Sequence, residues 1–248
     1  CPNEPCPLVR RLDRVAFRRV PAHYLKAGWL IDRDRYAGTV ESLIYNLPLL
    51  YDLPAVDGIL PLRSQEFLDV YQPLVRDSSR SLGVFGARWL VTTVRPSAPG
   101  MRQILRGPVS VWEDPNALPR AFAVHAFEAV ADPGARVARV VEGTGLRDTV
   151  ILNAAPEGFV PAHPPEGARS TVLIEEYAEN AITLHTSMAA DGFVVLLDRD
   201  YPGWQARIDG ESTPILRANH LFRALPVPKG EHRITYEFSP RSLTLGAI

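Results

Sequence analysis

Two carboxylates and two aromatic rings lie close together near residue 200. Asp198, Asp200, Tyr201 and Trp204 all fall within one short segment. In a sugar-binding site, aromatic faces stack on the apolar face of a pyranose ring, and carboxylates accept hydrogen bonds from its hydroxyl groups. This group therefore predicts a carbohydrate-binding site. The competing interpretation, which we favour because tryptophan is highly buried on average, places Trp204 in a core and leaves the aspartates solvated.

The same two aspartates have two further interpretations. Asp198 and Asp200 could be the acid pair of a glycoside hydrolase, whose carboxyl groups stand roughly 5–9.5 Å apart. They could also bind calcium, although calcium usually takes ~6–8 oxygen ligands and no second acidic cluster is evident. Because most acid pairs are ordinary surface residues, we predict no catalytic residue and no metal site in this chain.

Three polar residues are separated by two and by four positions around a predicted short turn: Arg217, Asn219 and Arg223. Arginine binds phosphate through two parallel hydrogen bonds. The set therefore predicts an anion-binding face, suited to a lipid phosphate or a polyanionic acceptor. The alternative, which we favour, is pairing with acidic residues of neighbouring strands, such as Asp209 or Glu211.

Other kinds of chemistry find little support in the sequence. The six histidines show no metal-ligand spacing, and there is no nucleophile elbow, P-loop or dinucleotide-binding glycine motif. A formal net charge of −1, with aromatic residues not interleaved with basic ones, argues against a nucleic-acid partner. We therefore predict no cofactor. Whether Cys1 and Cys6 form a disulfide stays open.

The first 155 residues carry mixed helix and strand signals. Apolar residues at three- and four-residue spacing predict a helix over 63–76, and a cap at Ser78 predicts a second short helix to about residue 85. Further helices are predicted over 39–46 and from Pro133 onward, and strands over 15–20, 87–94, 109–113, 121–130 and 149–152. These signals indicate a mixed α+β domain over residues 1–155.

The last third of the chain has the pattern of a β domain. Residues 156–169 are rich in proline, alanine, glutamate and glycine and are predicted to be a linker. Seven β-rich segments follow: 172–177, 181–187, 193–198, 204–208, 213–217, 221–227 and 231–238. They predict an antiparallel β-sandwich of jelly-roll or immunoglobulin-like type over residues 170–241, so that the whole chain is of the α+β class.

Several blocks of sequence resemble a known family when they are taken in order. They are 198–204 (Asp-Arg-Asp-Tyr-Pro-Gly-Trp), 208–210 (Ile-Asp-Gly), 217–219 (Arg-Ala-Asn), 222–232 and 240–242 (Pro-Arg-Ser), with 56–62, 82–91 and 116–122 upstream. Their types and order resemble the C-terminal extracytoplasmic region of the bacterial YfhO family. The resemblance covers most of the chain from about residue 45 and is strongest over 193–242.

Members of that family are multi-pass membrane proteins that look like glycosyltransferases using polyprenyl-phosphate-linked sugars to decorate cell-envelope polymers. The resemblance implies a chain on the extracytoplasmic face of the cell membrane, with an accessory acceptor-binding or structural role and no catalysis alone. It implies an envelope glycan or lipid-linked sugar and the protein's own membrane helices as partners, and it makes residues 242–248 the start of a truncated membrane helix. The catalytic carboxylate of such transferases lies in a loop that this sequence does not contain.

Two other functions remain open from the sequence. The chain could be a secreted carbohydrate-binding module joined to an α+β partner domain. It could also be a self-sufficient hydrolase that uses Asp198 and Asp200.

Overall fold

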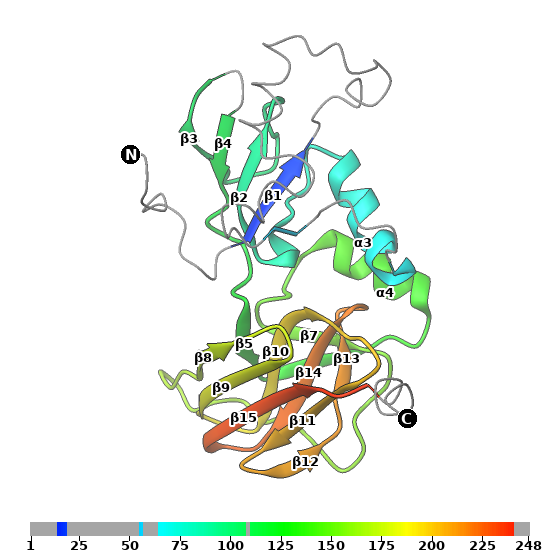
Figure 1. Ribbon diagram of the computed structural model, residues 1–248, viewed down its shortest axis with the longest axis vertical. Helices are drawn as coiled ribbons and strands as arrows, with labels where there is room; N and C mark the ends of the chain where they lie inside the picture. The colour runs from blue at the N-terminus through cyan, green and yellow to red at the C-terminus, as the bar shows by residue number, and fades with distance from the viewer. Residues whose placement is uncertain (1–13, 19–54, 57–63, 108–109, 241–248) are drawn as a thin grey trace, which may run out of the picture. The chain divides into compact units, whose positions relative to one another are not determined.

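The computed structural model describes residues 14–18, 55–56, 64–107 and 110–240. The chain divides into two compact units, Cys1–Pro119 and Arg120–Ile248. Strands predominate and pair mostly antiparallel, an architecture compatible with the predicted α+β class (Figure 1). The predicted helix over 39–46, the Cys1 and Cys6 pair and the predicted membrane-helix start at 242–248 lie outside the described residues.

The first unit contains a four-stranded sheet in the order β1-β2-β4-β3. Its strands are β1 (Arg14–Arg18), β2 (Ala87–Thr92), β3 (Arg102–Leu105) and β4 (Ser110–Glu113). The first two strands pair in parallel, and the other pairs are antiparallel. Strand β3 was not predicted, because all four of its residues are exposed and no alternation of apolar and polar residues marks it.

Helix α3 (Gln65–Arg76) confirms the helix predicted over 63–76. It begins at Ser64, whose hydroxyl accepts a hydrogen bond from a backbone N–H of the first turn. The apolar stripe read from the sequence is the buried face of the helix: Phe67, Val70, Tyr71 and Leu74. This helix therefore forms because its spacing presents one continuous apolar surface.

The second short helix predicted in this unit is wrong. Only a 3₁₀ turn forms there, η2 (Gly83–Phe85). Gly86 adopts a left-handed conformation with φ of 72° and ends the turn, because glycine tolerates that region without a Cβ clash. Gly83 is needed as well, since a Cβ at this position would lie 2.6 Å from Oδ2 of Asp114.

The second unit contains two sheets that share one hydrophobic core. The six-stranded sheet has the order β5-β10-β14-β13-β7-β6, and the five-stranded sheet has the order β12-β11-β15-β9-β8 (Figure 1). The strands of the first sheet are β5 (Ala121–Val124), β6 (Ala126–Ala129), β7 (Thr149–Leu152), β10 (Gly192–Arg199), β13 (Leu216–Ala218) and β14 (Phe222–Val227). Those of the second are β8 (Thr171–Tyr177), β9 (Ala181–Met188), β11 (Trp204–Ile208), β12 (Glu211–Thr213) and β15 (Gly230–Phe238).

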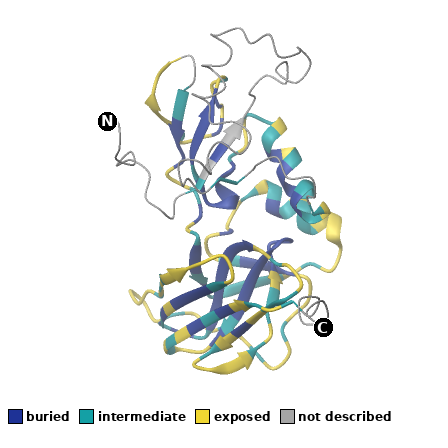
Figure 2. Ribbon diagram, in the orientation of Figure 1, coloured by how far each residue is buried: buried dark blue, intermediate teal, exposed yellow. Residues whose placement is uncertain are grey.

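The core between these sheets explains the burial pattern of the strands. Val194 and Leu196 of β10 pack with Leu184 of β9 and Ile234 of β15, and all four are fully buried. Figure 2 shows the central strands as the dark, buried part of this unit. The continuous apolar run in β10 is typical of a central strand, and β10 indeed lies between β5 and β14.

Helix α4 (Pro133–Glu142) connects the parallel strands β6 and β7. The carboxylate of Asp132 accepts a hydrogen bond from the N–H of Ala135 at 2.7 Å, and Pro133 occupies the first turn, as predicted. Gly143 ends the helix in a left-handed conformation.

The boundary between the units lies between Pro119 and Arg120, and not at the predicted linker over 156–169. Strand β5 pairs with β10, and β7 pairs with β13, so residues 121–152 belong to the same sheet as the later strands. Phe159 of the predicted linker packs against Phe193 of β10 with ring centroids 5.3 Å apart. This segment therefore covers the sheet instead of separating two domains.

Candidate functional site

Asp198 lies near the end of β10, at an irregularity in its pairing with β14. The register shifts between Leu196 and Arg199, which is the mark of a β-bulge. Asp198 is only 7% exposed. A carboxylate taken out of water at this depth requires compensating partners, because an unpaired buried charge is very costly.

Three side chains provide that compensation. Nη2 of Arg120 lies 2.8 Å from Oδ1 of Asp198, and the hydroxyl of Tyr177 donates to Oδ2 at 2.9 Å. Nη2 of Arg223 lies 3.8 Å from the same Oδ2. Arg120 and Tyr177 also contact each other, with the guanidinium 4.5 Å from the ring centroid. We call Arg120, Tyr177, Asp198 and Arg223 the Asp198 cluster.

Arg223 is held between two aromatic rings inside the unit. Its guanidinium carbon lies 4.1 Å from the ring centroid of Trp204 and 5.4 Å from that of Tyr236. Burial lowers the pKa of Arg223, and the charge of Asp198 acts in the opposite direction. Burial also raises the pKa of the Tyr236 hydroxyl above its ordinary value. The raised pKa favours the neutral phenol of Tyr236, while the charge of Asp198 favours the protonated guanidinium of Arg223.

Trp204 is consequently engaged within the protein. It is partly buried, one of its faces meets Arg223, and Phe238 lies 5.3 Å away between ring centroids. The interpretation of Trp204 as a packing residue, which the sequence favoured, agrees with this geometry. The accompanying prediction that Asp198 is solvated is wrong, because Asp198 is buried and paired.

Asp200 and Tyr201 directly follow the last residue of β10. Tyr201 is 61% exposed. Oδ2 of Asp200 accepts a hydrogen bond from Nε of Arg217 at 3.2 Å. The ring of Tyr201 lies 6.5 Å from that of Phe238 between centroids. An exposed aromatic ring can stack on a sugar, and a carboxylate and a guanidinium can hydrogen-bond its hydroxyl groups. We call Asp200, Tyr201 and Arg217 the Tyr201 group.

The members of the predicted anion-binding set have different partners. Arg217 and Arg223 are direct neighbours across β13 and β14, but the first pairs with Asp200 and the second belongs to the Asp198 cluster. Asn219 lies in the turn between these strands with φ of 47°, and its Oδ1 accepts the backbone N–H of Ile151 at 2.9 Å. This asparagine is therefore a structural turn residue that connects to β7.

Sequence reasoning missed the partners of Asp198. Arg120 precedes the first strand of the unit, and Tyr177 ends β8, so nothing in their local sequence connects them with residue 198. Tyr236 carried one usable signal, because it alternates with Ile234 on the apolar side of β15. The bulge in β10, which directs Asp198 toward its partners, has no signature in the sequence.

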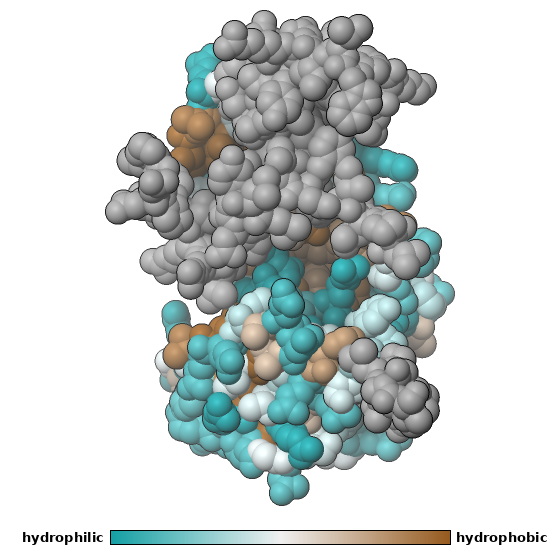
Figure 3. All heavy atoms as spheres, in the orientation of Figure 1, coloured by the Kyte–Doolittle hydropathy of each residue, from teal (hydrophilic) through white to brown (hydrophobic). Residues whose placement is uncertain are grey.

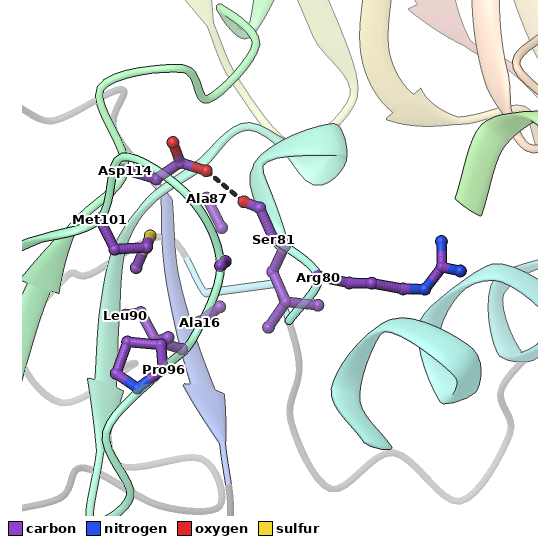
Figure 4. A pocket seen from close by; sticks show the side chains of 10 residues that line it. Ala16, Arg80, Ser81, Ala87, Leu90, Pro96, Met101 and Asp114 are labelled. Carbon is purple, nitrogen blue, oxygen red and sulfur yellow. Dashed lines mark hydrogen bonds between the residues drawn. The ribbon is translucent and has the colours of Figure 1, made fainter. Parts of the chain in front are cut away.

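A small cavity lies within the first unit. It has a volume of about 10 Å³, which is room for roughly one water molecule. Ser81 donates to the carboxylate of Asp114 at its edge, while the side chain of Arg80 points away from the other lining residues (Figure 4). Because Gly83 N–H also donates to Ser81, this serine holds the η2 turn together. A cavity of this size does not accommodate an organic ligand.

Glu113 is a buried carboxylate of the first unit. Its two oxygens accept from Arg88 at 2.8 Å and from Arg102 at 2.7 Å. The hydrogen bond from Arg88, followed by the positive charges of both arginines, holds the pKa of Glu113 below its ordinary value. This pairing joins neighbouring strands of the sheet and is structural.

The viewed surface of the second unit is mostly hydrophilic (Figure 3). Within the described ranges, no helix has the length and apolar character needed to cross a bilayer, and no group of three or more histidine, cysteine, aspartate or glutamate side chains could hold a metal ion. Comparisons of the chain with protein-family models, with curated proteins and with solved structures found no match.

Proposed function

We propose that this chain is the extracytoplasmic portion of a multi-pass, glycosyltransferase-like membrane protein of cell-envelope glycan assembly. Its role there is to bind or position the acceptor glycan, without catalysis of its own. We further propose that the two sheets of the second unit form a β-sandwich of jelly-roll or immunoglobulin-like type. The ordered blocks of sequence that resemble the YfhO family support the first proposal, and the shared core between the sheets supports the second.

The observation that carries acceptor binding is the Tyr201 group. Tyr201 is 61% exposed, although an aromatic ring of this size usually buries much of its surface. Asp200, which directly precedes Tyr201 in the chain, pairs with Arg217 at 3.2 Å, and these two side chains offer an acceptor and donors. The Asp198 cluster contains the buried Asp198 and Arg223 and supports the end of β10, which Asp200 and Tyr201 directly follow. The Tyr201 group therefore binds the glycan, and the Asp198 cluster supports the structure around it.

The hydrolase interpretation finds no support in this geometry. Asp198 pairs with Arg120 and Arg223, and Asp200 pairs with Arg217. Both carboxylates are therefore engaged in ion pairs within the protein. Neither aspartate is placed for proton transfer to a glycosidic oxygen.

The test of acceptor binding is a titration of the protein with soluble fragments of envelope glycans, followed by nuclear magnetic resonance. We expect saturable chemical-shift changes at the Tyr201 group. Tyr201→Ala should weaken binding about 5- to 30-fold, which corresponds to roughly 1–2 kcal/mol of lost stacking and burial.

Leu173→Ala is the matched control, since Leu173 of β8 is 64% exposed and lies outside the Tyr201 group. Its affinity should equal that of the wild-type protein. Equal affinities for the Tyr201→Ala variant and this control would show that the group is not the acceptor site. The absence of any saturable binding would favour a purely structural role.

The membrane assignment has a separate test in the gene. We expect several apolar segments of ~20 residues to be encoded before this region and another near its end. A lone secretion signal upstream and a stop codon directly downstream would instead support the secreted carbohydrate-binding module. The Tyr201 group serves either protein, so this test separates the two without changing the proposed site.

A further inference from the structure

A serine and a histidine from distant parts of the sequence meet in the second unit. His125 lies between β5 and β6, and Ser170 directly precedes β8. Oγ of Ser170 lies 2.8 Å from Nε2 of His125, and both residues are partly exposed. Asp191, which completes the arrangement, precedes the first residue of β10, whereas the Asp198 cluster lies near the other end of that strand. The pair is therefore separate from the Tyr201 group.

The hydrogen bonds of His125 fix the position of its proton. Nδ1 lies 3.1 Å from the carbonyl oxygen of Asp191. Because a carbonyl oxygen can only accept, Nδ1 carries the ring hydrogen and Nε2 presents a lone pair. The Ser170 hydroxyl therefore donates to Nε2. A nucleophile, a base and a third group that orients the base stand here in the order that activates a serine.

The orienting carbonyl is itself firmly held. It also accepts the backbone N–H of Ala162 at 2.9 Å, and the Asp191 carboxylate accepts the N–H of Lys229 at 2.7 Å. The imidazole rests against Gly192, where a Cβ would lie 2.6 Å from Nδ1. Glycine is thus required at this position for the ring to reach both partners.

From this geometry, we propose that Ser170 and His125 form a catalytic pair that hydrolyses small O-acyl esters. Oγ of Ser170 attacks the ester carbonyl carbon while His125 takes the hydroxyl proton. The carbon–oxygen bond of the ester then breaks, and His125 gives the proton to the departing alcohol. Water, deprotonated by His125, next attacks the acyl carbon. The bond from this carbon to Oγ breaks, His125 gives the proton to Oγ, and the carboxylic acid is released.

The backbone N–H of Ala189 donates to Oγ of Ser170 at 2.9 Å and fixes the position of the nucleophile. The exposure of the pair narrows the substrate class. The pair is partly exposed, and a short acyl group such as acetyl suits a site that is reached directly at the surface. This activity goes beyond glycan binding and does not depend on it.

The test is covalent labelling of the full chain with a fluorophosphonate, a probe that reacts with activated serines, and localisation of the adduct by peptide mass spectrometry. We expect the adduct on Ser170, and turnover of p-nitrophenyl acetate that Ser170→Ala removes. Ser187→Ala is the matched control, because Ser187 of β9 is also partly exposed on the same sheet, opposite Thr171. Its labelling and turnover should equal those of the wild-type protein.

The role of the base is tested by His125→Gln, which retains a hydrogen-bonding side chain but cannot take a proton. Labelling should fall by about 10²- to 10⁴-fold, the usual contribution of a general base. Ser170→Cys covers the case in which Ser170→Ala fails to fold: its mapped thiol should alkylate faster at neutral pH than the thiol of Ser187→Cys. An unlabelled Ser170 in the folded wild-type protein, or equal labelling of His125→Gln, would overturn the proposal.

Discussion

The two aspartates that the sequence grouped together have different environments, and their substitution should have different consequences. Asp198→Asn leaves Arg120 and Arg223 without their buried counter-charge. Breaking a buried pair in this way should cost about 3–5 kcal/mol of unfolding free energy. Asp200→Asn disturbs only the partly exposed pair with Arg217 and should cost less than about 1 kcal/mol. Urea unfolding of both variants measures the difference, and similar losses would contradict the structural role of Asp198.

A second residue-scale prediction concerns acid stability at Asp209. The backbone N–H of Arg233, at 2.8 Å, and the ring of His232, at 2.7 Å, hold the pKa of Asp209 below its ordinary value. Because the folded-state pKa is depressed, the stabilisation is complete above the unfolded pKa of about 3.9 and is lost as the pH falls through the folded value.

Asp209→Asn should remove this pH dependence. Asparagine tolerates the positive φ of 52° at this position, so the backbone is preserved. The difference in unfolding free energy between the wild-type protein and the variant should shrink as the pH is lowered from 5 toward 3. A difference that stays constant over this range would show that the Asp209 carboxylate makes no such contribution.

At the scale of elements, the stability of helix α4 depends on the capping residue that precedes it, Asp132. Asp132→Ala removes the acceptor for the Ala135 N–H and should cost about 1 kcal/mol. Asp132→Ser retains a capping oxygen and should restore most of that loss. Thermal unfolding of the two variants makes the comparison. If the serine variant were as unstable as the alanine variant, the capping hydrogen bond would not be the cause.

Local patterns predicted the elements better than they predicted the interruptions within them. The strand predicted over 213–217 is two strands, because Pro214 has no N–H for the ladder and the chain crosses there from the five-stranded to the six-stranded sheet. The strand predicted over 121–130 is likewise interrupted at His125, where β5 ends beside β10 and β6 continues beside β7. Alternation of side chains reports which face is buried but not which strand will be the neighbour.

At the scale of the whole molecule, the sequence alone could not locate the division of the chain. A proline-rich segment resembles a linker whether it joins two domains or lies against one, and contacts such as that between Phe159 and Phe193 separate these cases. The same limit applies to the candidate site. The cluster near residue 200 was visible as a local motif, whereas its division into buried and exposed halves depends on Arg120 and Tyr177, which lie far away in the sequence.

The division between Pro119 and Arg120 predicts which fragments of the chain fold cooperatively. A fragment of residues 120–240 contains every strand of both sheets of the second unit, and we expect it to unfold cooperatively in urea. A fragment of residues 156–240, which begins at the linker predicted from the sequence, lacks β5, β6 and β7. It would expose one edge of β10 and remove Arg120 from the buried Asp198. We therefore expect it to lose cooperative unfolding and dispersed amide resonances. Native-like spectra for the shorter fragment would instead place the folding boundary at the linker.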